Sequence, residues 1–474
     1  MHSNELIQLG AADLARLIRS RDVDPVDVVD AHIAQIDRVN PRIKALVTVT
    51  FDRAREEARR IRDRIPDRTC DLPPLLGVPV TVKDALPVDG LRFTAGSAFY
   101  RNNVATKDAE AVRRIKEAGA IVLGKTSCSD MSASAETTNL IVGLTRNPWK
   151  LDHSAGGSSG GEAALIASCG SPLGLGADFG GSIRIPAAFC GVVGLKPTGG
   201  RIATDGHIPQ TPDTVSEWNT VGPLARRVQD VALALSVLSK TPTMDYLSID
   251  LRARPLLEPR FLSSLPVNRE VAVAVETAGA ALRSAGMVGQ RVSLPFTKVA
   301  LESTGVLSRE YLSSLRTALG GGEPVRLLDE FWAHYRRRPR ISLPCLMALT
   351  MFSLFGPMVQ ALGYGRLEEI KKLRSIILQS MKPGSLMLWP VFPTTAPKHG
   401  FAWKLNKSPS YTGIFNSLGF PAIAMPVGLS NDKLPLSVQI VGCPNEDETV
   451  LAAAAALEKA FGPSALPPTS ALSS

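Results

Sequence analysis

Residues 156–184 read GGSSGGEAALIASCGSPLGLGADFGGSIR and hold nine glycines and five serines. A glycine and serine content this high is typical of a flexible linker. Two apolar stretches interrupt it, however, because EAALIAS favours a helix and PLGLGA favours a strand. We therefore expect an ordered core segment, in which small residues stand where chain segments approach each other closely.

Short apolar stretches alternate with helical patterns over most of the chain. Before residue 66 the sequence favours helices, with apolar residues at three- and four-residue spacing. Such alternation predicts an α/β fold around a mixed sheet. Residues 240–268 and 301–340 have no regular pattern, and we expect them to be irregular insertions on one large domain. The expected strands are GVPVTVKD, AIVLG, PLGLGAD, LMLWPV, PAIAMPV and LSVQIVG, and the expected helices are Ala109–Gly119, Gly160–Cys169, Val228–Leu238 and Glu446–Phe461.

Composition narrows the class of protein. The chain has 474 residues, 45% of them hydrophobic, and a net charge of +9. Acidic residues alternate with basic ones in stretches such as RAREEARRIRDR, which indicates a solvated surface and no nucleic-acid partner. The six cysteines form no CxxC pair and the six histidines are scattered, so we expect reduced thiols, no metal site and no cofactor. The N-terminus lacks the pattern of a signal peptide, and we expect a cytoplasmic protein.

One segment is unusually apolar for a soluble protein. Residues 341–362, ISLPCLMALTMFSLFGPMVQAL, form a run of 22 residues without a charge, flanked by basic clusters at 336–340 and 371–374. The length suffices to cross a bilayer, but Pro344 and the Gly356–Pro357 pair should break a straight helix. Three interpretations stay open: a membrane span, a buried pair of core helices, and a cap over a lipophilic pocket or on a membrane surface.

Two serine motifs compete for the role of nucleophile. Residues 156–160, GGSSG, fit the GxSxG elbow of α/β-hydrolases. That elbow needs an apolar strand directly before it, whereas NPWKLDHSA has the pattern of a loop. It also needs a downstream histidine, and His207, His334 and His399 stand in contexts without a supporting pattern. We therefore disfavour the elbow.

The second motif, DFGGSIR at 178–184, follows the expected strand PLGLGA. Two glycines before Ser182 let successive backbone N–H groups point to one spot, which is the geometry of an oxyanion hole. Without a histidine the base must be another group, and a lysine serves only when burial lowers its pKa and leaves it neutral. Lys83 ends the apolar strand VPVTVKD and is a candidate, although a salt bridge to Asp84 would explain it equally well.

Several motifs together resemble those of the amidase signature family. They are GGSSGGEAAL, DFGGSIRIP and GLKPT, with GVPVTVKD, AGAIVLGKT and TRNPW before them and GPLAR and FNSLGFPAIAMPVG after them. Within the family the resemblance is nearest to fatty acid amide hydrolases, and it is thinnest at 240–340, where the usual strand after GPLAR is hard to recognise. It implies a large twisted mixed β-sheet covered by helices on both faces. It also implies a single domain over 1–474, made of N-terminal helices (1–65), a catalytic core (66–239), a variable cap and pocket region (240–385) and core strands with a closing helix (386–465).

The resemblance also implies catalytic roles. The family's lysine falls on Lys83, its bridging serine on Ser158 and its nucleophile on Ser182, 24 residues after Ser158. Neutral Lys83 would take a proton through Ser158 as Ser182 attacks the carbonyl, and would return it to the leaving amine. The supporting set is an oxyanion hole from the N–H groups of Phe179, Gly180, Gly181 and Ser182, with bracing by Ser159, Asp178 and Arg184. Separately, the apolar segment 341–362 leads us to expect Met351 and Phe355 in the substrate pocket, and we add Met131 as a further candidate.

These implications predict a serine hydrolase that cleaves lipophilic fatty-acyl or aryl amides, and also esters and carbamates. The alternative is the glutamine-hydrolysing subunit of a tRNA-dependent transamidation complex, which uses the same core but needs a polar pocket; the apolar segment 341–362 argues against it. A non-catalytic scaffold is disfavoured because all three catalytic positions are filled. We further expect a monomer or homodimer, with peripheral membrane contact through 336–374.

Overall fold

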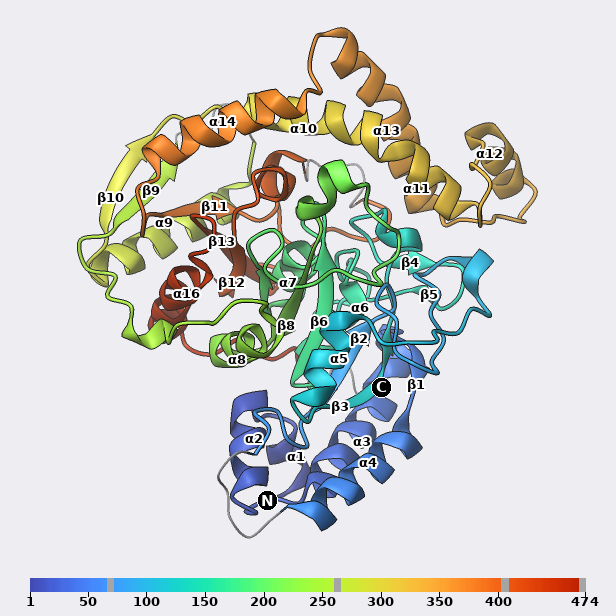
Figure 1. Ribbon diagram of the computed structural model, residues 1–474, viewed down its shortest axis with the longest axis vertical. Coiled ribbons are helices and arrows are strands. Elements are labelled where there is room, and N and C mark those ends of the chain that lie inside the picture. The colour runs from blue at the N-terminus through green and yellow to red at the C-terminus, as the bar shows by residue number, and fades with distance from the viewer. Residues whose placement is uncertain (66–71, 260–265, 402–408, 469–474) are drawn as a thin grey trace.

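A single large sheet organises the protein. The computed structural model describes residues 1–65, 72–259, 266–401 and 409–468. In these ranges eleven strands form one sheet in the order β1-β3-β2-β6-β8-β7-β12-β13-β11-β9-β10 (Figure 1). The strands of the sheet are β1 (Leu46–Val49), β2 (Pro79–Lys83), β3 (Ile121–Thr126), β6 (Leu173–Asp178), β7 (Val193–Lys196), β8 (Thr220–Ala225), β9 (Pro255–Pro259), β10 (Val288–Val292), β11 (Leu386–Pro390), β12 (Ala422–Leu429) and β13 (Pro435–Gly442).

The sheet is mixed, as the sequence predicts. Strand β2 runs parallel to β3 and β6, and β9 runs parallel to β10 and β11. The other neighbours in the sheet pair antiparallel. A separate two-stranded ribbon joins β4 (Thr138–Asn139) and β5 (Gly143–Leu144).

Helices cover both faces of the sheet. They are α1 (Ser3–Leu6), α2 (Ala11–Arg19), α3 (Pro25–Ile43), α4 (Phe51–Arg64), α5 (Glu110–Glu117), α6 (Gly160–Ala167), α7 (Arg184–Cys190), α8 (Val228–Leu238), α9 (Arg269–Ser284), α10 (Phe296–Glu310), α11 (Leu312–Leu319), α12 (Leu327–Tyr335), α13 (Leu343–Ala361), α14 (Leu367–Ser380), α15 (Ile414–Ser417) and α16 (Asp447–Phe461). Strand β3 shows why two layers are needed, since successive side chains of a strand point to opposite faces. Ile121 and Leu123 pack in the cluster that includes α4 and α6, whereas Val122 packs in the cluster that includes α2, α5 and α8. The predicted fold class is confirmed.

The region between residues 240 and 340 differs from the prediction. Residues 301–340, expected to be irregular, lie mostly in α10, α11 and α12. Buried residues such as Val299, Val306, Leu315 and Leu319 hold this region against its neighbours. The strand that was hard to recognise after GPLAR is β9, which pairs with β10 and β11. Its two prolines and a glutamate hid it, because prolines are depleted in strands.

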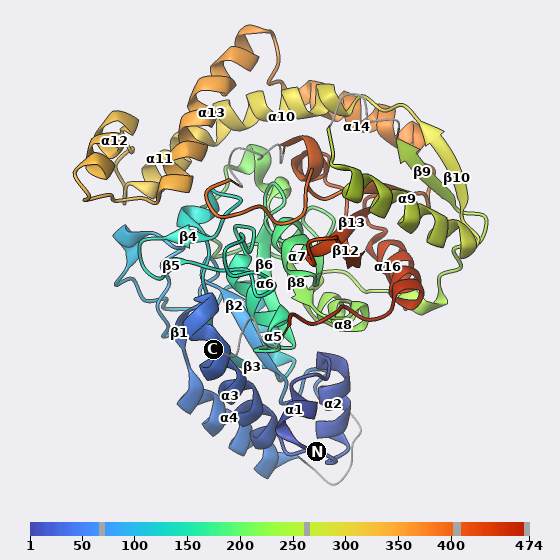
Figure 2. The same cartoon turned by 180° about the vertical axis from the view of Figure 1, so that it is seen from behind.

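The apolar segment forms one helix rather than a broken pair. Helix α13 is continuous over 19 residues, so the predicted break is wrong. Pro344 stands in the first turn, where the missing N–H has no helical partner in any case. Pro357 lies inside the helix, which continues past it. At the neighbouring Gly356, α13 packs closely on α10, since a Cβ there would collide with Ser308. Figures 1 and 2 show α10, α13 and α14 arching together over one end of the molecule.

Helix α13 is neither fully buried nor fully exposed. In the described part of the chain it alone has the length and apolarity of a membrane span, with a mean hydropathy of 1.5, and 28% of that stretch is buried. Leu346 and Leu349 are buried, whereas Leu354 is 65% and Met358 51% exposed. The interpretation as a buried core helix therefore fails for its outer face.

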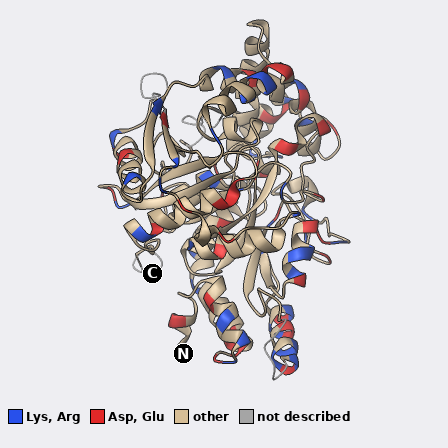
Figure 3. Ribbon diagram, turned by 60° about the vertical axis from the view of Figure 1, so that its left-hand side comes forward, with Lys and Arg blue, Asp and Glu red and all other residues tan. Residues whose placement is uncertain are grey.

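Charged residues of both signs share the outer helices (Figure 3). On α4, Arg60 pairs with Glu56, and Arg55 reaches Asp30 at 2.6 Å. Five cysteines are free and buried, and Cys70 lies outside the described residues. No cluster of three or more metal-ligating side chains occurs within the described ranges.

Candidate active site

Three chain segments meet at one edge of the sheet. Lys83 ends β2 and Asp178 ends β6, and because these strands are parallel neighbours their carboxyl ends lie together. The Lys83 Nζ lies 3.5 Å from the backbone oxygen of Ala177, beside the turn that leads to Ser182. The third segment, residues 156–159, precedes α6 and carries Ser158.

Lys83 donates a hydrogen bond to Ser158. The distance from Lys83 Nζ to Ser158 Oγ is 2.7 Å, and both side chains are fully buried. Burial lowers the pKa of Lys83 to about 8, against smaller opposing effects of Cys128, Asp178 and Glu162. A lysine with this pKa is in part neutral near pH 7 and can accept a proton.

The competing explanation for Lys83 fails in the described residues. Asp84 does not pair with Lys83; its carboxylate lies 3.1 Å from Lys125 Nζ, and both of these side chains are fully buried. Thr94 also donates to Asp84. Lys83 is therefore free of a direct ion pair there, as a neutral amine requires.

Ser182 lies where the loop containing Ser158 and the turn after β6 meet. The Ser159 amide donates to Ser182 O at 3.1 Å, and Ser159 Oγ donates to Ala177 O at 3.4 Å. Glycine permits this approach: Gly156 has a φ of +80°, and a Cβ there would lie 2.6 Å from the Cα of Pro186. Ser182 is only partly buried, and it lines the same cavity as Lys83 and Ser158.

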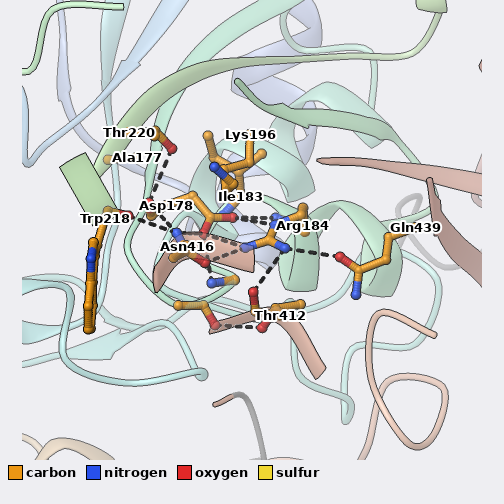
Figure 4. Close-up of polar contacts among 12 residues, drawn as sticks. Ala177, Asp178, Ile183, Arg184, Lys196, Trp218, Thr220, Thr412, Asn416 and Gln439 are labelled. Atoms are coloured by element: carbon orange, nitrogen blue, oxygen red, sulfur yellow. Dashed lines mark hydrogen bonds and ion pairs between the residues drawn. The ribbon is translucent and has the colours of Figure 1, made fainter. Parts of the chain in front are cut away.

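A buried ion pair holds the turn that carries Ser182 (Figure 4). Arg184 Nη2 lies 2.9 Å from Asp178 Oδ1, and both side chains are fully buried. Burial opposes ionisation of Asp178, but the charge and hydrogen bonds of Arg184 outweigh it and hold the pKa of that carboxyl well below its usual range. Asn416 and Gln439 complete the set: Asn416 Nδ2 donates to Asp178 Oδ1 at 3.0 Å, and Arg184 Nη1 donates to Gln439 Oε1 at 3.0 Å. Neither residue was singled out from the sequence.

The oxyanion hole predicted from the sequence needs one correction. The Gly181 amide donates to Asp178 Oδ1 at 2.7 Å, so it is not free to bind a substrate oxygen. Gly181 serves the turn instead, because its φ is +119° and a Cβ would collide with Thr412. The amides of Phe179, Gly180 and Ser182 have no acceptor in the described part of the chain and remain as donors.

The cavity in front of Ser182 is walled on one side by helices. These cap helices, α10, α11 and α13, bring apolar side chains over the catalytic edge, which is the place at the carboxyl ends of β2 and β6 where Lys83, Ser158 and Ser182 line the cavity. The Phe179 ring contacts the cap directly, 4.8 Å from the ring of Tyr311. Lys83 is the single Lys, Arg, Asp or Glu among the described residues that line the cavity. The apolar lining residues include Phe179, Ile185, Trp218, Leu307, Tyr311, Leu312, Leu315, Ala348, Leu349 and Phe352.

The three pocket residues predicted from the sequence do not line this cavity. Met351 and Phe355 lie on the outer face of α13, 40% and 45% exposed, whereas Leu349 and Phe352 face inward. The error is one of helical phase, since neighbouring positions of a helix point about 100° apart.

Met131 is buried one layer behind the cavity wall. It packs among cap residues such as Leu346, while the next residues along the chain, from Ser132, line the cavity. Asp130 ties this loop to α13: it accepts hydrogen bonds from both the amide and the hydroxyl of Ser342, the N-cap of that helix.

Several further polar residues line the cavity, and two of them, His207 and Asn219, carry no motif that singles them out in the sequence. Both are buried in the cavity wall, and the Asn219 Nδ2 lies 3.2 Å from His207 Nδ1. Burial, and next to it the nearby Lys83, lowers the pKa of His207 to about 3. His207 is therefore a very weak base, which leaves Lys83 as the better proton acceptor in the cavity.

Comparison with known proteins decides the family. The family model for Amidase matches residues 27–451. The chain belongs to the amidase signature family. This amidase is 32% identical to a glutamyl-tRNA(Gln) amidotransferase subunit of Sulfurihydrogenibium sp., over 94% of its own length and 96% of the relative's. It is 31% identical to human fatty-acid amide hydrolase 2, over 96% of its own length and 90% of the relative's.

Solved structures agree with this assignment. The amidase superimposes on 6-aminohexanoate cyclic dimer hydrolase with a TM-score of 0.78 at 28% identity, over 97% and 99% of the two chains. It is thus a hydrolase of the family that acts on C–N amide bonds. The resemblance to fatty acid amide hydrolases is no stronger than that to the amidotransferase relative, so sequence identity does not separate these two branches.

Proposed function

We propose that this amidase hydrolyses neutral, lipophilic amides through an acyl-enzyme on Ser182, with Ser158 and Lys83 as a proton relay. The observation that carries the proposal is the 2.7 Å contact between Lys83 Nζ and Ser158 Oγ, buried beside a cavity with an apolar wall. A low-pKa lysine can do the work that histidine does in other serine hydrolases.

In the proposed reaction, Ser182 Oγ attacks the carbonyl carbon of the amide. Its proton passes to Ser158 Oγ, and the proton of Ser158 passes to Lys83 Nζ. The developing oxyanion takes hydrogen bonds from free amides of the turn, of which Gly180 and Ser182 are the nearest to the nucleophile in sequence. The relay then runs in reverse: Lys83 returns the proton through Ser158 to the leaving nitrogen, and the C–N bond breaks. A water molecule then attacks the ester carbonyl while the same relay takes its proton. The bond to Ser182 breaks, Ser182 regains a proton, and the carboxylic acid is released.

Charge in the cavity supports a neutral substrate. A zwitterion such as glutamine carries an ammonium and a carboxylate, and burying either group without a counter-charge is costly. The described lining holds no acid to pair with an ammonium. Apolar side chains from all three cap helices, such as Leu307, Leu312 and Phe352, suit an alkyl or aryl group instead. Esters and carbamates present the same carbonyl and belong to the proposed substrate class.

The amidotransferase alternative remains a second candidate, because the relative that is 32% identical carries that function in its name. One experiment separates the two. The purified chain is assayed with glutamine and with aryl and alkyl amides of graded chain length, side by side. Hydrolysis of the neutral amides that is at least tenfold faster supports the proposal, and preferential release of ammonia from glutamine would replace it with the alternative.

We also propose that the outer face of α12 and α13 rests on an anionic membrane surface. Leu354 and Met358 of α13 and Trp332 of α12 are more than half exposed. The arginines at 336–338 lie between the two helices in sequence, and each basic residue near such a surface adds about 1 kcal/mol of attraction. Lipophilic substrates would then reach the cavity along an apolar path.

A further inference from the structure

One part of the cavity wall contains a buried polar pair. His207 and Asn219 are 7% and 4% exposed, and both line the cavity. His207 Nδ1 lies 3.2 Å from Asn219 Nδ2 and 3.2 Å from the backbone oxygen of Pro209. The other polar atoms of the pair, His207 Nε2 and Asn219 Oδ1, have no hydrogen-bond partner among the described residues. Buried polar atoms are rarely left without a partner, so this pair requires an explanation.

The possible positions of the protons determine which hydrogen-bond donor and acceptor the pair leaves free. If His207 Nδ1 is unprotonated, it accepts from Asn219, which leaves Nε2–H as a donor and Asn219 Oδ1 as an acceptor. If Nδ1 carries the proton, it donates to Pro209 O, and the Asn219 amide must turn to avoid an N–H facing an N–H. Nε2 is then the acceptor, and the turned amide presents its NH₂ as the donor. In both arrangements one donor and one acceptor, on adjacent side chains, are left without a partner among the described residues.

The pair is also uncharged. Burial, and then Lys83, lowers the pKa of His207 to about 3, so the imidazole is neutral at physiological pH. A neutral donor next to a neutral acceptor does not attract a carboxylate or an ammonium. It is complementary to an uncharged group that shows a C=O and an N–H on the same edge. A primary carboxamide does so, and so does a ring amide held cis, whereas the C=O and N–H of an open-chain trans amide point in opposite directions.

We propose that His207 and Asn219 form a subsite for a second amide of the substrate, a primary carboxamide or a cis ring amide, distinct from the amide that is cleaved. This rests on the function proposed above and narrows it. The preferred substrate is then amphiphilic: its apolar part lies against the cap helices and its second amide against the polar pair.

A second buried histidine provides a control within the same chain. His32 of α3 is fully buried, its Nδ1 lies 3.2 Å from Cys169 O, and its Nε2 also lacks a described partner. Burial and Arg226 lower its pKa to about 3. His32 does not line the cavity, and among the described residues it has no hydrogen bond with an asparagine. Substitution of His32 therefore tests the effect of removing a buried imidazole without touching the subsite.

The test uses matched 4-nitroanilides whose acyl chain ends in a carboxamide (CONH₂) or in the isosteric methyl ketone (COCH₃). Spacers of two to five methylenes scan the position of the second group, and release of nitroaniline gives kcat/KM for each. We expect the carboxamide to be favoured about 10-fold or more over the ketone at one spacer length, since the ketone leaves a buried acceptor unpaired. Asn219→Leu should bring this ratio close to one. His207→Gln should keep more of the ratio than His207→Phe, and His32→Phe should leave it unchanged.

The outcomes separate the two proposals. Release of nitroaniline that depends on Ser182 but shows no carboxamide preference at any spacer would overturn this inference alone. So would an equal loss on carboxamide and ketone in the Asn219 and His207 variants, which would make the pair structural. Hydrolysis that survives Ser182→Ala would overturn the proposed function and this inference with it. The comparison of the two substrates on the unmodified enzyme needs no variant, so it decides even if Asn219→Leu does not fold.

Discussion

The catalytic edge and the cap hold opposite kinds of structure. At the catalytic edge, Lys83, Ser158, Asp178 and Arg184 are fully buried and joined by hydrogen bonds and an ion pair. The cap helix α13 has no charged residue, contacts the catalytic region with one face and leaves residues such as Leu354 65% exposed on the other. Under the proposed function, we expect the chemistry to depend on the buried network at the catalytic edge, and the preference among substrates to depend in part on the apolar wall that the cap supplies.

Removal of the base should have the largest effect. Lys83→Ala is expected to lower kcat/KM by at least the 10²–10⁴-fold typical of general-base catalysis. The folded protein is verified by circular dichroism, and rates are measured on one aryl amide. A loss of less than tenfold in a folded variant would contradict the role of Lys83. It would also mean that the catalytic edge does not supply the chemistry that we assign to it.

The pH dependence of kcat/KM provides a second test of Lys83 as the base. Burial places the pKa of Lys83 at about 8, below its ordinary value, and only the neutral amine accepts a proton. The kcat/KM of the unmodified enzyme should therefore rise as the pH increases through about 8 and level off above it. The Lys83→Ala variant should lack this limb, and its deficit should shrink at high pH, where hydroxide substitutes for the base. An identical limb in both proteins would assign it to another group.

Removal of the ion pair between Asp178 and Arg184 should lower the stability of the fold as well as the catalytic rate. Arg184→Ala leaves Asp178 buried without its partner, and such losses amount to about 3–5 kcal/mol in the free energy of unfolding. Because the pKa of Asp178 is held low, its ionised form contributes at neutral pH and is lost only in strong acid, so urea unfolding is measured near pH 7. The control is Arg252→Ala, which breaks an exposed pair with Asp250 and should leave the free energy of unfolding nearly unchanged. Equal effects would show that the network at the edge has no special weight.

Truncation of the inner face of the cap should have a moderate effect on selectivity. Phe352→Ala is expected to raise KM for long-chain or aryl amides about tenfold and to spare acetyl amides, because it removes an apolar wall of the cavity. Met351→Ala, one position along the same helix and 40% exposed, should change neither value more than twofold. Equal kinetics for the two variants would mean that the cavity does not hold the substrate.

A charge introduced on the outer face of α13 should have the smallest effect on the kinetics, but it should weaken binding to membranes. Leu354→Asp is expected to leave the hydrolysis of water-soluble amides within about twofold, because Leu354 is exposed and lies outside the cavity lining. It should reduce co-sedimentation with anionic phosphatidylserine vesicles, since it removes an apolar contact and adds repulsion. Unchanged binding, or no binding by the unmodified protein, would refute the membrane contact.

The residues of the catalytic edge could be singled out from the sequence because their signals are local. The apolar run before Lys83, the strand before Asp178 and the glycines around Ser182 are read directly along the chain, and the family resemblance assigns roles to them. The structure corrects Gly181, whose amide is committed to Asp178, because hydrogen-bond partners depend on how the turn closes.

The cap and the polar pair could not be predicted in the same way. Whether Met351 or Phe352 faces the cavity depends on where α13 begins and how it is rotated against α10, and the prolines suggested a break that does not occur. His207 lies in the stretch between β7 and β8, without any periodic pattern, and meets Asn219 only through tertiary packing.

The central claim is that Ser182 is the nucleophile and that Lys83 and Ser158 activate it. The most direct test is reaction with a fluorophosphonate, followed by peptide mass mapping of the adduct in the unmodified enzyme, Ser182→Ala and Ser158→Ala. We predict a single adduct on Ser182, none in Ser182→Ala, and slower labelling of Ser182 in Ser158→Ala. An adduct on Ser158 that persists in Ser182→Ala would contradict the account and restore the GxSxG serine as the nucleophile.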